Sequence, residues 1–163
     1  MTRTCGVLGA LAVAFGATVI AIEQPTKEFQ DLMKSNSAIV DLVGGNNALG
    51  RDTNVDVPRS EEPGGPSIRA HMSAKDYDAI VKDVATLKAN FAKIEAFWTE
   101  RKVQDAIEFS KTATRLAGDI ETAAKAKDNA GIVKAQAELA NTCRACHLAH
   151  RVIMLTEQKF AIR

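Results

Sequence analysis

Aromatic residues are scarce in this sequence, which has six phenylalanines, one tyrosine and one tryptophan among 163 residues. Sheet proteins depend on aromatic and β-branched side chains, whereas alanine, which is plentiful here, has the highest helix propensity. The composition therefore favours an all-α fold. Neither sign of charge is in excess, since the formal net charge is +1. Nucleic acid is not an expected partner, because binding it needs a basic field.

The first 21 residues differ from the rest of the chain. Arg3 is their one charged residue, and residues 5–22 form an uncharged, mostly apolar run before Glu23. A short basic start followed by such a run is typical of a secretory signal. We expect cleavage after Ala21, which leaves residues 22–163 as one domain in the periplasm. The alternative is an uncleaved anchor at the outer face of the cytoplasmic membrane, because the run is nearly long enough to span a bilayer.

Cysteine is also scarce, with three in the chain. Cys5 lies in the expected signal, so the mature chain keeps Cys143 and Cys146, which are three positions apart. An exported protein with only these two cysteines is not a disulfide-stabilised scaffold.

Four stretches space their apolar residues three and four positions apart, which indicates amphipathic helices. They are residues 25–43 before Gly44-Gly45, a second helix with Ser73 as N-cap and a stripe over 77–98, a third over 103–124, and a fourth from about Asn129 through Ile153. Residues 46–72 hold three of the four prolines and are expected to form a long loop, with a short element inside it as an open alternative. No alternating strand pattern competes. Short connections predict an antiparallel up-down-up-down four-helix bundle.

The last helix carries the motif Cys143-Arg144-Ala145-Cys146-His147. This C-x-x-C-H pattern is the attachment signature of c-type haem. Residues three and four apart share one helix face, so both cysteines can bond to one edge of a haem while His147 reaches its iron. Two alternatives are a redox-active dithiol and a zinc site made of these three side chains with His150.

A second iron ligand has to come from another helix, which excludes Met154 and His150. In an up-down-up-down bundle the start of the first helix lies beside the end of the fourth. Met33, roughly 10 Å into the first helix, then lies level with His147. His71 and Met72 precede the second helix at the opposite end, and His71 is expected to be an exposed loop residue. Met33 is therefore the expected distal ligand, and ordinary core packing is its alternative role.

These features resemble the class II cytochromes c, which include cytochrome c-prime and its low-spin relatives. Three segments carry the resemblance, which covers essentially the whole mature chain: Leu32-Met33-Lys34-Ser35-Asn36, Phe97-Trp98, and the C-x-x-C-H motif followed by Arg151. The resemblance implies a haem near the end of the bundle where helices one and four meet, with thioethers at Cys143 and Cys146, His147 as proximal ligand and Met33 as distal ligand. His150 departs from the family, which often has an aromatic residue there. We expect it to face solvent, and a hydrogen bond near the haem is the alternative.

The expected function is one-electron transfer between redox partner proteins by a His147- and Met33-ligated haem c. The sequence shows no acid–base or nucleophilic constellation, so no enzyme activity is expected. If Met33 does not bind iron, a five-coordinate haem that binds nitric oxide or carbon monoxide is the alternative. A haem-free helical or zinc module is a third. Members of the resembled family often form homodimers, but no apolar stripe in this sequence indicates one.

Overall fold

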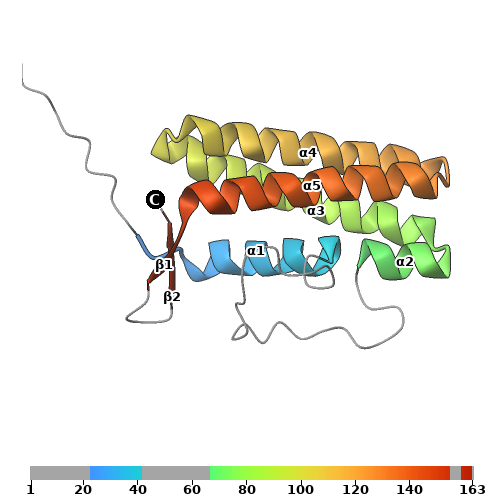
Figure 1. The fold of residues 1–163 in the computed structure, drawn as a ribbon, viewed down its shortest axis with the longest axis horizontal. Helices are drawn as coiled ribbons and strands as arrows, with labels where there is room; N and C mark the ends of the chain where they lie inside the picture. The colour runs from blue at the N-terminus through green and yellow to red at the C-terminus, as the bar shows by residue number, and fades with distance from the viewer. Residues whose placement is uncertain (1–22, 42–66, 155–158, 163) are drawn as a thin grey trace, which may run out of the picture.

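The computed structural model describes residues 23–41, 67–154 and 159–162. This part of the chain is mostly helical, with five helices and one two-stranded antiparallel sheet (Figure 1). The elements are α1 (Lys27–Val40), α2 (Ile68–Ala74), α3 (Tyr77–Arg101), α4 (Gln104–Lys125), α5 (Asn129–His150), β1 (Arg151–Met154) and β2 (Lys159–Ile162). Residues 1–22, on which the expected signal and its cleavage site fall, lie outside the described residues. In the described ranges, no helix is both long and apolar enough to cross a membrane.

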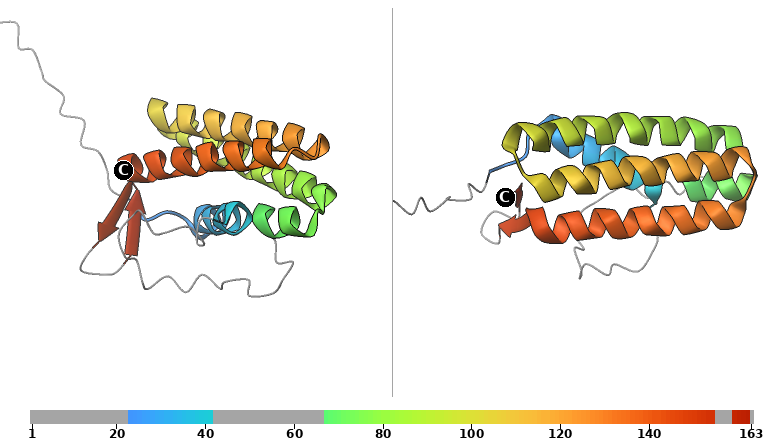
Figure 2. Two further views of the ribbon diagram at one scale, coloured as in Figure 1. Left: turned by 45° about the vertical axis from the view of Figure 1, so that its right-hand side comes forward. Right: turned by 90° about the horizontal axis from the view of Figure 1, so that it is seen from above.

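Helices α3, α4 and α5 pack as antiparallel neighbours, which confirms the predicted helical bundle at this level. Two residues separate α3 from α4 and three separate α4 from α5, and connections this short return the chain beside itself. Figure 2 shows α1 running along the same bundle, with α2 continuing beyond its end. The start of α1 and the end of α5 lie at the same end of the molecule (Figure 1).

The N-cap of α3 differs from the predicted one. Asp76, not Ser73, is the N-cap, and its side chain accepts a hydrogen bond from the Ala79 backbone N–H at 3.0 Å. Ser73 lies inside α2, where its hydroxyl donates to the Arg69 carbonyl at 3.0 Å. Residues 46–66 of the predicted loop lie outside the described residues. Its last residues, from Ile68, belong to α2, as the alternative of a short element inside the loop allowed, and Ile68 is fully buried. Both serine and aspartate suit a cap, and the burial of α2 decides between them.

The first helix is shorter than predicted. It ends at Val40, and Asp41 follows in a left-handed conformation with φ 55°. The predicted stop at Gly44-Gly45 lies outside the described residues. At the other end, Thr26 caps the helix by accepting from the Phe29 backbone N–H at 3.2 Å.

The predicted fourth helix is too long, and the absence of strands is wrong. Helix α5 ends at His150, and β1 then pairs antiparallel with β2 from Arg151 opposite Ile162 to Met154 opposite Lys159. Val152 and Ile153 are β-branched and suit a strand, but their partners, Ala161 and Phe160, are nine and seven residues away in the chain. Backbone hydrogen bonds in both directions between Glu23 and Ile162, at 3.0 and 2.9 Å, join the two ends of the described chain.

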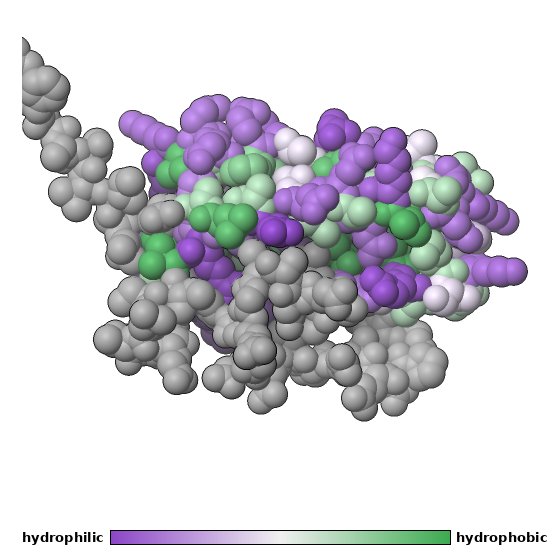
Figure 3. All heavy atoms as spheres, viewed as in Figure 1, coloured by the Kyte–Doolittle hydropathy of each residue, from purple (hydrophilic) through white to green (hydrophobic). Residues whose placement is uncertain are grey.

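The core is an aliphatic seam between the long helices. Its largest fully buried side chains are Ile68, Ile80, Val84, Leu87, Leu116, Ile120, Ile132 and Leu139. The face in Figure 3 is mainly hydrophilic over the helices, with hydrophobic side chains scattered among the polar ones. The seam packs α3, α4 and α5 against one another, so the position of the α5 backbone, and of the side chains that it carries, follows from this packing.

Candidate functional site

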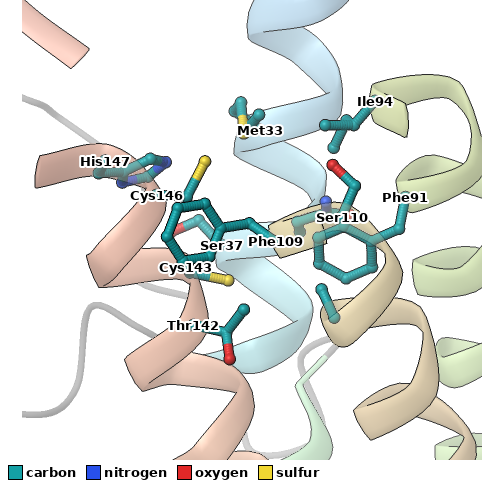
Figure 4. Close-up of a pocket in the computed structure, with 12 residues that line it drawn as sticks. Met33, Ser37, Phe91, Ile94, Phe109, Ser110, Thr142, Cys143, Cys146 and His147 are labelled. Atoms are coloured by element: carbon teal, nitrogen blue, oxygen red, sulfur yellow. The ribbon is translucent and has the colours of Figure 1, made fainter. Parts of the chain in front are cut away.

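A pocket opens between α1, α3, α4 and α5 beside the aliphatic seam (Figure 4). It is lined by Met33, Asn36 and Ser37 from α1, Phe91 and Ile94 from α3, Phe109, Ser110 and Ala113 from α4, and Thr142, Cys143, Cys146 and His147 from α5. All four residues singled out in the sequence therefore line one pocket. Met33 reaches it from the helix opposite the other three.

One hydrogen bond shows how α1 and α5 are aligned along their axes. The Gln136 side-chain amide donates to the Val40 carbonyl at 2.8 Å. Met33 lies seven residues before Val40, and Cys143 lies seven residues after Gln136. Because the helices run in opposite directions, both lie about 10 Å from this bond toward the same end. This register places the methionine thioether across from the cysteine pair, as the labelled side chains in Figure 4 show.

The two cysteines are not joined by a disulfide. Burial raises the pKa of the Cys143 thiol to about 12, with a smaller contribution from neighbouring Cys146. Burial, and then the negative charge of Asp105, raises the pKa of the Cys146 thiol to about 11. A redox-active dithiol needs a stabilised thiolate and hence a lowered pKa. Both thiol pKa values are raised here, so the environment disfavours the redox-active dithiol alternative.

His147 is neutral in this environment. Burial lowers the pKa of its imidazole to about 4, and the positive charge of Arg151 contributes in the same direction. A neutral imidazole keeps a lone pair free on one ring nitrogen, which is the form that binds a metal. At neutral pH no proton has to leave before His147 acts as a ligand.

His150 does not face solvent, so that expectation is wrong. Its side chain is buried, and its Nε2 lies 3.1 Å from an Asp105 carboxylate oxygen. Its ring also lies against Trp98, with centroids 5.2 Å apart. The zinc alternative needed His150 beside the motif. Among the residues that the structure describes, no three histidine, cysteine, aspartate or glutamate side chains gather to hold a metal ion.

His71 also departs from its expected place in an exposed loop. It belongs to α2, and its side chain is only 17% exposed. Its Nε2 lies 3.4 Å from an Asp83 carboxylate oxygen. Burial raises the pKa of Asp83, and His71 opposes that shift. Helix α2 lies at the opposite end of the bundle from the α5 C-terminus, so His71 is remote from the motif (Figure 1).

Sequence reasoning assigned no role to Asn36, which the structure places on the pocket wall. Its side chain is 5% exposed, and its Oδ1 accepts a hydrogen bond from Asn90 Nδ2 at 2.8 Å. Asn36 follows Met33 by three residues, so a polar residue on the same face as Met33 was the available signal.

The pocket thus combines two thiols, a neutral imidazole and a facing thioether with walls that are mostly carbon. In comparisons with known proteins, no family model, no curated protein and no solved structure matches this chain.

Proposed function

We propose that this protein is a class II-like c-type cytochrome that carries single electrons between redox partner proteins. One haem c would be bonded to Cys143 and Cys146 and held by His147 on one side and Met33 on the other. The observation that carries the proposal is the convergence of these four side chains from two opposed helices on one pocket. The site lies toward the end of the bundle where α1 begins and α5 ends.

The chemistry of the two thiols fits covalent attachment. Cys143 and Cys146 would each add the thiol across a vinyl double bond of the haem, with the sulfur bonded to one carbon and the thiol hydrogen transferred to the neighbouring carbon. The addition needs no oxidant, but it does need cysteines that are reduced and unlinked, as Cys143 and Cys146 are here. Their spacing on α5 turns both sulfurs to one face.

The pocket walls fit an apolar ring. Phe91 and Ile94 on α3 and Phe109 on α4 provide hydrocarbon surface. A hydrophobic shell controls how far water enters a metal site and thereby its redox potential. These walls belong to the helices that form the packed seam, so they limit rearrangement when the charge at the site changes.

The two axial residues favour electron transfer over ligand binding. Bound haem iron supplies the one-electron exchange, and its potential depends on its axial ligands. His147 is neutral, and Met33 faces the motif at the same level of the bundle. With His147 and Met33 both bound, no iron position would stay open for a gas ligand, and the thioether ligand would raise the potential. We therefore propose no enzyme activity for this chain.

Haem staining of the full-length protein after denaturing electrophoresis tests covalent attachment. The protein is expressed with its own N-terminus in a host that attaches haem c to exported proteins. The band is expected to stain, because thioether bonds survive denaturation. An unstained band from protein recovered after export would overturn the proposal. The mass of the recovered chain tests the signal, since cleavage after Ala21 predicts a product that begins at Ile22.

Replacing Met33 with alanine tests the distal ligand. The oxidised parent is expected to show the weak long-wavelength band of a methionine–iron bond and to react slowly with carbon monoxide when reduced. The Met33→Ala protein is expected to lose the band and to bind carbon monoxide at once. Leu32→Ala is the matched control, because Leu32 is on the same helix but does not line this pocket. A parent that binds carbon monoxide at once would instead support the gas-binding alternative.

A further inference from the structure

We infer that the side-chain amide of Asn36 donates a hydrogen bond to the sulfur of Met33 when that sulfur is an iron ligand. Asn36 then sets the electron density at the distal ligand and with it the reduction potential. The inference rests on the proposed function and adds a positioning residue to it.

The starting observation is a buried donor without a partner. Three buried side-chain polar atoms in the described part of the chain have no hydrogen-bond partner: Asn36 Nδ2, Asp83 Oδ2 and Trp98 Nε1. Of these three residues, only Asn36 lines the pocket. Leaving a buried amide donor unpaired is costly, and native proteins rarely retain such a group without a use for it.

The contacts of Asn36 orient its amide. Asn90 on α3 donates through Nδ2 to Asn36 Oδ1 at 2.8 Å and to Ser35 Oγ at 3.2 Å. The oxygen end of the Asn36 amide is therefore held toward α3. The Nδ2 end is left for another acceptor, and the pocket is the space that this residue lines.

Met33 is the acceptor that the position of Asn36 favours. The two residues are three positions apart on α1, so their side chains share a helix face, and both line the pocket. The hydroxyls of Ser110 and Thr142, which line it too, donate to carbonyls of their own helices, and neither oxygen accepts a hydrogen bond from Asn36 Nδ2. A thioether sulfur that binds a metal through one lone pair keeps a second lone pair to accept a hydrogen bond.

A hydrogen bond to the ligand sulfur has a definite consequence. It withdraws electron density from the sulfur, which then donates less to the oxidised iron. Hydrogen bonding to ligands is one of the means by which a protein tunes a metal site. The amide should therefore favour the reduced protein and restrain the Met33 side chain.

The test compares two substitutions in the haem-bearing protein. Asn36→Leu removes the amide at similar volume. Asn90→Ala breaks the same Asn36–Asn90 bond but leaves the Asn36 amide in place. Equilibrium redox titration measures the reduction potential, and the long-wavelength band reports on the methionine–iron bond. For Asn36→Leu we expect a lower potential, with the reduced-to-oxidised ratio at a fixed ambient potential falling about threefold to tenfold, the equivalent of one ordinary hydrogen bond. The band should shift as well. Asn90→Ala should shift both measurements in the same direction but by less, because the donating amide is still present although Asn90 no longer orients it.

The outcomes separate this inference from the proposed function. Equal shifts in the two variants, or no shift in Asn36→Leu, would overturn the inference while leaving the His147–Met33 assignment intact. An unmutated protein without the methionine–iron band would overturn both this inference and the assignment of Met33 as an iron ligand. A measurement on the unmutated protein covers the case in which Asn36→Leu does not fold. In the reduced parent labelled with ¹⁵N, the Asn36 side-chain amide protons should exchange slowly with solvent, and rapid exchange would also overturn the inference.

Discussion

The seam of α3, α4 and α5 and the space between α1 and α5 are built on different principles. The seam is closed by aliphatic side chains such as Val84, Leu87, Leu116 and Ile120, which are at most 2% exposed. The pocket beside it contains sulfur, imidazole and an amide donor without a partner. The seam consists of packed aliphatic side chains, whereas the pocket is lined by sulfur-containing and polar side chains, one of which lacks a hydrogen-bond partner. The difference separates the part that provides stability from the part that provides chemistry.

Removing both thiols should have the largest effect, and only on the pocket. In the Cys143→Ala, Cys146→Ala double variant we expect complete loss of haem staining, because no thioether can form. Circular dichroism should still show a helical protein, since the seam is untouched. Thr142→Val is the control, because Thr142 lines the same pocket but its hydroxyl bonds to the Glu138 carbonyl. Staining retained in the double variant would contradict the attachment at these positions.

Truncation in the seam should have the next largest effect, and on stability. Leu116 is 2% exposed, so Leu116→Ala should lower the free energy of unfolding by about 2–5 kcal/mol through lost burial and a residual cavity. Met33→Ala in the haem-free protein should cost less, because Met33 is only partly buried beside an existing pocket. Denaturant titration measures both variants. Equal costs would mean that the pocket side is packed as tightly as the seam.

Removing the Asp105 carboxylate, which contacts His150 at the border between the seam and the pocket, should lower stability by less. Asp105 contacts His150 Nε2 at 3.1 Å and accepts from the Ala106 backbone N–H at 3.0 Å. Asp105→Ala should therefore lower the free energy of unfolding by about 1 kcal/mol. Glu108→Ala, an exposed acid on the same helix, should change it by a few tenths at most. Indistinguishable denaturation midpoints would show that the Asp105–His150 contact does not hold α5 to α4.

The smallest expected effect is on the pH dependence of the unfolding free energy, and it comes from Glu121, a surface carboxylate that links α3 and α4. Hydrogen bonds from Lys125 and then Lys88 lower the pKa of Glu121 to about 2, from an ordinary value of 4.5. Because the folded-state pKa is the lower one, this stabilisation is present above pH 4.5 and is lost as the pH falls toward 2. Glu121→Gln should therefore flatten the acid-side decline in unfolding free energy, and salt should weaken the difference. An unchanged pH profile would show that the Lys88–Glu121 link between α3 and α4 does not contribute to stability.

The sequence predicted most of what depends on short spacing along the chain. The long helices follow their apolar stripes, and α3 and α4 cover the predicted stretches. The cysteine spacing predicted that both thiols share a face of α5. Boundaries were less predictable, because Ser73 and Asp76 are both suitable caps and the burial of Ile68 in α2 decides between them.

The amino-acid sequence by itself determined the amphipathic helices and the grouping of Cys143, Cys146 and His147 on one of them, because both depend on residues three and four apart. Only the tertiary structure decided the register of Met33 against α5, the burial of His150, the β1–β2 pairing and the unpartnered amide of Asn36. Each of these depends on contacts between residues far apart in the chain. Burial, which also sets the pKa of the thiols and the imidazole, exists only once the helices have packed.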